Sequence, residues 1–322
     1  MRMIGVLPFV VLTLISWGLY GPLLHHGRAG MNNNSLLQFI CVGLAYFAIA
    51  VVIPLITLKF RGEKGRWTIR GTIWSLSAGS IGAIGALGVI FALANGGNPV
   101  YVMPLVFGLA PVVNTLFSMW MAGTLKEAGK VFLLGIFLVA LGAAGVMYSK
   151  PNTSSVTPIW DLSVMQAALI LVSVGVTALC WGAYGPVLHK GQMRMNGSRL
   201  RPFLCVGLAY FAIAVVVPLI VMSVSNDAFT STAPGILWSL GAGAAGAIGA
   251  MGIILAFNFG GKPVFVMPLV FGGAPVINTL EFIIQERAYD QLSILFYASL
   301  SLVIFGAVLV LVFAPKSPAA SK

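Results

Sequence analysis

The chain has 322 residues, of which 59% are hydrophobic and only 8% are charged, whereas a soluble globular chain carries roughly 25% charged residues. This composition excludes a soluble enzyme, which needs a charged surface, and a disordered chain, which needs low hydrophobicity. The net charge of +11 does not indicate a nucleic-acid partner, because the basic residues lie between apolar segments rather than on a helix face.

Ten apolar stretches of about 20 residues follow one another along the chain, and this is the length of helix that crosses ~30 Å of hydrocarbon. In chain order they are 4–24, 36–58, 73–94, 99–122 and 130–149, then 163–187, 202–223, 235–258, 263–285 and 291–313. A helix satisfies its own backbone polar groups in lipid, whereas an open sheet does not. The predicted fold class is therefore an all-α integral membrane protein with ten transmembrane helices.

The second half of the chain repeats the first with an offset of 164 residues. Segment 16–22, Ser-Trp-Gly-Leu-Tyr-Gly-Pro, returns at 180–186 as Cys-Trp-Gly-Ala-Tyr-Gly-Pro, and segment 41–52 is identical to segment 205–216. The match needs no gap from position 16 to position 116. Self-similarity of this extent predicts a duplicated five-helix domain.

We place the two five-helix repeats at 1–152 and 160–315, and an odd number of helices in each predicts that the second enters the membrane inverted. The flanking charges agree, because connector 59–70 carries five basic residues and its counterpart 223–234 carries none. With the N-terminus in the cytoplasm, 15 of the 18 Lys and Arg residues are cytoplasmic. The positive-inside rule therefore predicts a multi-pass protein of the inner or plasma membrane with both termini cytoplasmic.

Two inverted five-helix repeats resemble the drug/metabolite transporter superfamily, and specifically its EamA-type members. The resemblance rests on the Trp-Gly pairs at 17–18 and 181–182, on a glycine-rich third helix, and on the fourth helix of each repeat. In that helix, Met-Pro-Leu is followed seven residues later by a second proline and then by Asn-Thr. The resemblance implies movement of small metabolites by alternating access, with substrates too varied for the fold to name one.

The fourth helix of each repeat carries two prolines seven residues apart, which places them on one face. They are Pro104, Pro111, Pro268 and Pro275. Each proline frees a carbonyl that needs another partner in lipid. We expect a bent helix that lines a cavity, with a packing kink as the alternative.

Asn114 and Asn278 are repeat partners that lie one turn beyond the second proline of each helix. Because the two helices run in opposite directions, the two amides should straddle the membrane midplane. An amide there offers a donor and an acceptor to a polar solute. The alternative is an interhelical hydrogen bond worth about 0.6–2 kcal/mol.

Two aromatic pairs, Trp17 with Tyr20 and Trp181 with Tyr184, recur at spacing i, i+3 and therefore share a helix face. We expect them to form the aromatic wall of a cavity. The alternative is a membrane-interface belt, because Trp and Tyr favour that depth. Two further tyrosines, one in each copy of the identical segment, are predicted to serve in packing: Tyr46 and Tyr210.

Glu281 is an acidic residue inside a predicted span, and its repeat partner is Phe117. An ionisable residue in a span is a candidate functional group, so we expect a proton-linked or substrate-linked role, or a solvated place near the outer interface. No Lys or Arg falls near a predicted midplane, which favours a neutral or cationic solute over an anion.

The sequence thus predicts a secondary transporter for a small neutral or cationic organic metabolite, uncoupled or driven by a proton or ion gradient. We predict no enzymatic activity, cofactor or metal site, because the spans contain no nucleophile-base pair, no metal-ligand spacing and no nucleotide-binding loop. The partners are the solute and the lipid bilayer, without nucleic acid, and a homodimer is left open. The alternative is a non-transporting membrane scaffold or sensor, which would have a closed core.

Overall fold

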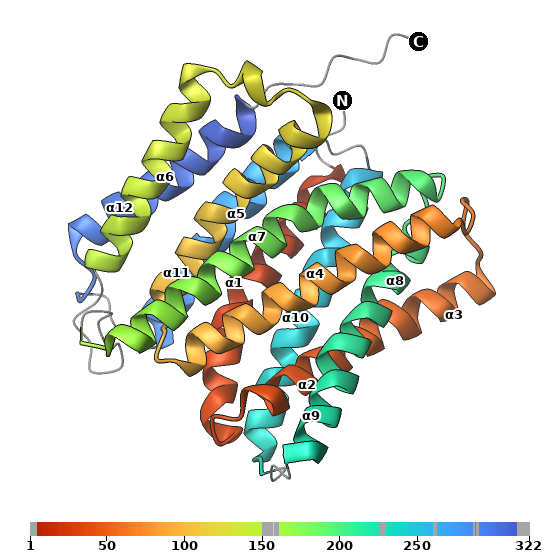
Figure 1. The fold of residues 1–322 in the computed structure, drawn as a ribbon, viewed down its shortest axis with the longest axis horizontal. Coiled ribbons are helices and arrows are strands. Elements are labelled where there is room, and N and C mark those ends of the chain that lie inside the picture. The colour runs from red at the N-terminus through yellow and green to blue at the C-terminus, as the bar shows by residue number, and fades with distance from the viewer. Residues whose placement is uncertain are drawn as a thin grey trace.

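The computed structural model describes residues 5–149, 157, 161–225, 230–259, 263–285, 287 and 290–313. These residues form ten continuous helical rods and contain no strand (Figure 1). The rods of the first half are α1 (Leu7–Gly30), α2 to α3 (Ser35–Phe60), α4 (Ile69–Ala94), α5 (Pro99–Ala122) and α6 (Lys130–Tyr148). Those of the second half are α7 (Val164–Arg194), α8 to α9 (Leu200–Ser225), α10 (Ala233–Asn258), α11 (Pro263–Gln285) and α12 (Ile294–Val312). The predicted all-α class is confirmed.

Seven of the rods are long and apolar enough to cross a membrane, and three further apolar helices are shorter over the residues searched. The three shorter helices are Lys130–Val146, Leu269–Gln285 and Ile294–Val310. Large apolar side chains face outward, for example Phe60 (76% exposed), Val164 (88%) and Ile294 (88%). Apolar surface of this extent marks a membrane or protein interface, and together with these helices it is consistent with a multi-pass membrane protein.

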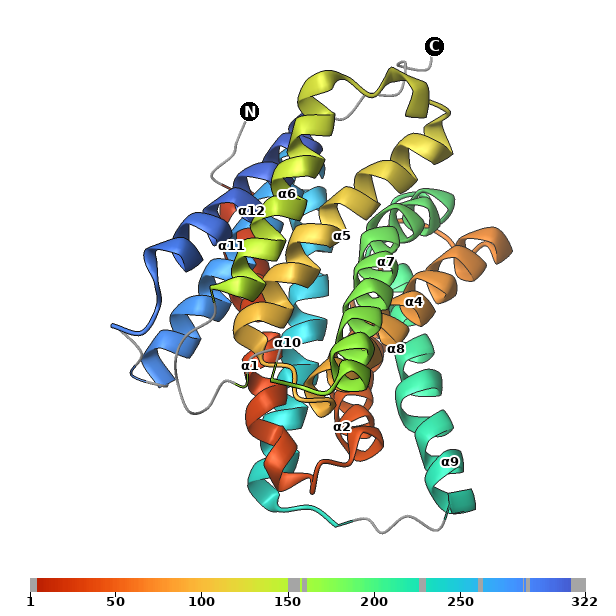
Figure 2. The same cartoon turned by 60° about the vertical axis from the view of Figure 1, so that its left-hand side comes forward.

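The two halves of the chain are interleaved rather than separate. Helix α1 packs against α10 and α4 packs against α7, so both contacts join one half to the other. Helices α5 and α11 pack against each other beside these pairs. In both views α6 and α12 lie together at one edge, and α8 and α9 lie at the opposite edge (Figures 1 and 2).

Two buried threonines show that the halves exchange equivalent contacts. Thr13 of α1 donates its hydroxyl to the carbonyl of Gly249 in α10 at 3.1 Å, and Thr177 of α7 donates to Gly85 of α4 at 3.0 Å. Each residue of one contact lies 164 positions from its equivalent in the other. The small residues of α4 and α10 allow this close approach of helix backbones.

The second rod of each half contains a five-residue π-helix that was not predicted, at Ala48–Val52 (η2) and Ala212–Val216 (η4). It joins α2 (Ser35–Phe47) to α3 (Ile53–Phe60), and α8 (Leu200–Phe211) to α9 (Val217–Ser225). Pro54 and Pro218 follow at the second position of the next helix. Because proline has no N–H, the carbonyl four residues earlier lacks its usual donor. The π-helix places its hydrogen bonds between residues five positions apart instead of four.

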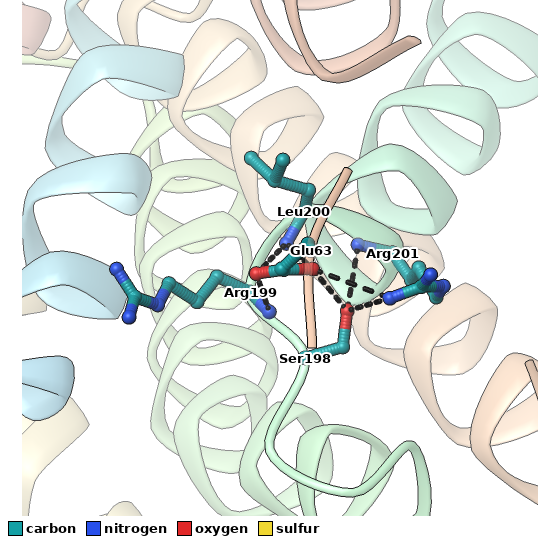
Figure 3. Close-up of polar contacts among 5 residues, drawn as sticks. All are labelled: Glu63, Ser198, Arg199, Leu200 and Arg201. Carbon is teal, nitrogen blue, oxygen red and sulfur yellow. Dashed lines mark hydrogen bonds and ion pairs between the residues drawn. The ribbon is translucent and has the colours of Figure 1, made fainter. Parts of the chain in front are cut away.

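One carboxylate ties the connector between α3 and α4 to the start of α8 (Figure 3). Glu63 Oε1 accepts hydrogen bonds from the backbone N–H groups of Arg199 at 2.8 Å and Leu200 at 3.3 Å. Glu63 Oε2 accepts from Ser198 Oγ at 2.6 Å and lies 3.4 Å from Arg201 Nη1. The first N–H groups of a helix have no partner within it, so this carboxylate of one half caps a helix of the other.

Replacing the cap is expected to loosen this junction. Glu63→Ala should lower the free energy of unfolding by about 2 kcal/mol, because hydrogen bonds to a charged group contribute about 1.5–3 kcal/mol. Glu63→Gln should lose less, since its carbonyl oxygen still accepts. The measurement is thermal unfolding in detergent, with Glu127→Ala, which removes an exposed carboxylate, as the control. Equal stability of all three variants would contradict the capping role.

Candidate functional site

A cavity of about 480 Å³ lies between the two halves of the molecule. Its walls come from α1, α2, α4, α5, α7, α8, α10 and α11. Both repeats contribute aromatic side chains to the walls. We call this space the chamber; its deep part is lined by Trp17, Tyr20, Tyr46, Trp181, Tyr184 and Tyr210.

The two tryptophans of the repeated motif line the chamber and are held by the glycine helices of the opposite half. Trp17 Nε1 donates to the carbonyl of Gly246 at 3.3 Å, and Trp181 Nε1 donates to that of Gly82 at 3.2 Å. Both indole N–H groups are therefore occupied by backbone. What the indoles offer to a solute is ring surface, not a hydrogen-bond donor.

The tyrosines of the chamber fall into two pairs. Tyr20 and Tyr184, which the motif singled out, line the chamber, and Tyr20 lies edge-on to Trp181 with ring centroids 5.7 Å apart. Tyr46 and Tyr210 stack on each other with centroids 3.7 Å apart and ring planes 4° from parallel. We predicted that this second pair would pack; the rings do so and border the chamber as well.

The two asparagines occupy different places although their sequence contexts match. Asn114 lines the chamber. Asn278 is not among the lining residues: its side chain is 0% exposed, and its Nδ2 donates to the carbonyl of Pro99 at 3.0 Å, joining α11 to α5. The interhelical hydrogen bond that we gave as the alternative is thus present at Asn278.

Three of the singled-out prolines, Pro104, Pro111 and Pro275, are not among the residues that line the chamber. Pro104 and Pro111 lie within α5, and Pro268 and Pro275 lie within α11. Thr115 Oγ1 donates to the carbonyl of Pro111 at 2.8 Å, which is not the carbonyl that Pro111 frees, since that one belongs to the residue four positions earlier. A different proline lines the chamber, Pro186 of α7.

Polar contacts join helices beyond Tyr20 along α1, and we infer that they close this end of the chamber. The guanidinium of Arg28 in α1 donates to the carbonyls of Leu93 and Ala94 at the end of α4, at 2.9 Å for Ala94. His26 Nε2 lies 2.9 Å from Glu281 Oε1 and joins α1 to α11. We call the end marked by Arg28, Asn278 and Glu281 the closed end. Glu281 thus lies away from the chamber lining, in a contact between helices.

The opposite end of the chamber is bordered by residues of α5 and α7 that the sequence did not single out for binding. They are Ser118, Met121, His189, Lys190, Gln192 and Met193. His189 and Met193 are exposed, so we call this end the open end. Lys190 directs its ammonium over the ring of Trp74, 4.2 Å from the centroid. Polar residues at the end of a membrane helix are typical of the membrane interface, so the sequence did not indicate a role in binding for them.

The two ends differ at equivalent positions. Arg28 at the closed end corresponds to Gln192 at the open end, and Glu281 corresponds to Phe117. Within the part of the chain that the structure describes, neither Gln192 nor Phe117 makes a counterpart of the closing contacts. The contacts that seal one end thus depend on residues that the other end does not have.

No protein-family model and no curated protein matches this sequence. The chain is similar to a solved structure described only as a crystal structure of a protein, with a TM-score of 0.59 over 98% of this chain and 99% of that chain. The two sequences are 14% identical. At that identity the similarity shows a shared fold and carries no function.

Proposed function

We propose that the protein is a secondary transporter that moves a small organic solute through the chamber by alternating access. In this proposal all ten rods cross the membrane, and the halves are inverted five-helix repeats of the EamA type. The observation that carries it is the chamber itself, which both repeats build, and which is sealed at one end and bordered by exposed residues at the other. Transporter sites lie between such repeats, near the bilayer midplane.

The distribution of basic residues supports an assignment of each end of the chamber to one side of the membrane. The open end lies near Arg194, Arg199 and Arg201, and the closed end carries Arg28. By the positive-inside rule, we assign the open end to the cytoplasm and the closed end to the outside. The structure would then be an inward-open state, in which solute exchanges with the cytoplasm.

The equivalent contacts of α1 with α10 and of α7 with α4 support a second state, in which the chamber opens at the other end. Because the halves are duplicates, either end can in principle adopt the arrangement that the other now has. In the outward-open state the Arg28 and Glu281 contacts would break, and the α5 and α7 ends would close on α10 and α11. We infer that Glu281 acts in closing the outer end, and that the solute binds deeper, at the aromatic walls and Asn114.

The test is a blocked chamber. A compound that stabilises the purified protein in a metabolite screen is radiolabelled, and its uptake into proteoliposomes is measured for Ser118→Cys in a background without the three native cysteines. We expect a membrane-impermeant thiol reagent to stop uptake when applied at the cytoplasmic face only, because position 118 borders the open end. Thr115→Cys is the matched control, since Thr115 lies on the same helix and is buried.

Orientation in the liposomes is calibrated by Arg66→Cys and Asp161→Cys, two exposed positions assigned to opposite faces. Block from both faces at position 118, or labelling of 66 and 161 from one face, would contradict the proposed topology. A protein that binds compounds yet moves none of them would instead be the scaffold or sensor named as the alternative.

A further inference from the structure

The deep chamber contains two phenol hydroxyls without a hydrogen-bond partner. The hydroxyl oxygens of Tyr20 and Tyr184 are buried, and neither bonds to any residue that the structure describes. Tyr20 is only 3% exposed. A buried hydroxyl without a partner is unfavourable, and these two are repeat partners that line one cavity. Because neither oxygen is exposed to the empty chamber, a molecule that enters reaches these hydroxyls by shifting the tyrosine rings.

The chamber offers no compensating charge to an ionised solute. Among its described lining residues there is no Asp or Glu, and the basic side chains, Lys190 and His189, stand at the open end. The ammonium of Lys190 is already placed over Trp74. Moving an unpaired ion out of water costs far more free energy than moving a neutral polar group that finds hydrogen bonds.

Several aromatic ring faces of the chamber are already engaged with other rings and are not free for a cation. A cation needs free ring faces, and Tyr46 and Tyr210 each use one face on the other. Tyr20 and Trp181 are engaged edge to face. The lining therefore favours flat apolar contact with a few hydrogen bonds, which is typical of sites for small neutral ligands.

We propose that the chamber binds an uncharged, flat ring compound whose polar substituent hydrogen-bonds to the hydroxyls of Tyr20 and Tyr184. This inference rests on the proposed function, in which the chamber is the site that binds the solute. It narrows the expected solute from a neutral or cationic compound to a neutral one. A phenol donates and accepts, so a carboxamide or a similar neutral group suits the pair.

The test uses three compounds of nearly identical shape and different charge: 2-naphthamide, 2-naphthoate and 2-naphthamidine, the last two being an anion and a cation at neutral pH. Binding to the purified full-length protein is measured by isothermal titration calorimetry. We expect the amide to bind at least about tenfold more tightly than either ion. Equal or tighter binding of either ion, or no binding of the amide, would overturn the proposal.

Variants then test the two hydroxyls. Tyr20→Phe and Tyr184→Phe each remove one oxygen and keep the ring, so the fold should persist. Each is expected to weaken 2-naphthamide about threefold to tenfold, as befits one hydrogen bond, and to leave 2-methylnaphthalene unchanged. Unchanged amide binding in both variants would remove the hydroxyls from the site. Because binding is read without transport, amide binding together with no uptake would count against the proposed function and not against this inference.

Discussion

Arg28→Gln is expected to open the closed end, raising the reactivity of a buried reporter toward an external reagent about 100-fold. The guanidinium serves two carbonyls at the end of α4, where the last carbonyls of a helix lack partners within it. Hydrogen bonds from a charged donor contribute about 1.5–3 kcal/mol each. Arg28 is half-buried, so solvent screening leaves about 3 kcal/mol for the two hydrogen bonds together. This free energy corresponds to a factor of ~100 in the equilibrium between the closed and open forms of this end.

The reporter is Leu24→Cys in the background without native cysteines. Leu24 is 0% exposed in α1, one turn before Arg28, whereas its repeat partner Leu188 lines the chamber toward the open end. Position 24 should therefore become accessible when the outer end opens. The rate of reaction with a membrane-impermeant thiol reagent, added outside intact cells, measures that opening.

Glutamine is the residue that the open end carries at the equivalent position, which allows a reciprocal control. With the open end closed, Gln192→Arg would place a guanidinium near the last carbonyls of α10, the sequence counterparts of those that Arg28 serves. It is expected to close the cytoplasmic end and to slow the labelling of Ser118→Cys from that side. An unchanged rate at position 24 in Arg28→Gln would mean that the guanidinium does not hold the outer end shut.

Apolar length predicted where helices would lie, because each rod buries its backbone polar groups and exposes apolar side chains. It placed the ends less well where helices continue into polar residues. The span predicted at 163–187 became a helix that reaches Arg194, and the one predicted at 4–24 reaches Gly30. These last turns carry histidines, Lys190 and Arg28, which a hydropathy criterion excludes although their backbone hydrogen bonds remain helical.

Some residues of the candidate site could likewise be identified from the sequence, and others could not. The repeated motif drew attention to Trp17, Tyr20, Trp181 and Tyr184, and all four line the chamber. The sequence could not separate Asn114 from Asn278, because both stand in the same Ala-Pro-Val-x-Asn-Thr-Leu context. Only the conformation distinguishes them, since one end of a duplicated structure is sealed and the other is not.

The hydrogen bond that joins Glu281 to His26 was also beyond sequence reasoning. These residues are 255 positions apart, and no spacing rule connects them. The comparison of repeat partners was the available signal, because Glu281 stands where the first half has Phe117 and His26 stands where the second half has Lys190. A position that breaks a close repeat indicates a role that only one half performs.

Gly85→Ala is expected to abolish most transport by moving an indole in the chamber wall. A Cβ at Gly85 would lie 2.4 Å from Trp181 Nε1, and one at Gly249 would lie 2.3 Å from Trp17 Nε1. The glycine belongs to a helix whose backbone cannot move away, so the indole must shift instead. Its hydrogen bond to the carbonyl of Gly82 or Gly246 is then expected to break. Overpacking of this kind costs about 1–3 kcal/mol.

The readouts are the unfolding temperature in detergent and the initial rate of solute uptake into proteoliposomes. We expect uptake to fall at least about tenfold in Gly85→Ala, since ~1.4 kcal/mol of lost solute binding already has that effect. Gly175→Ala is the matched control, because nothing lies within 4 Å of a Cβ at that position of α7. Adding Trp181→Phe should recover stability, because the smaller ring relieves the overlap, and a double-mutant cycle measures that coupling. If Gly85→Ala behaves like Gly175→Ala, close packing of the glycine helix does not hold the indole in place.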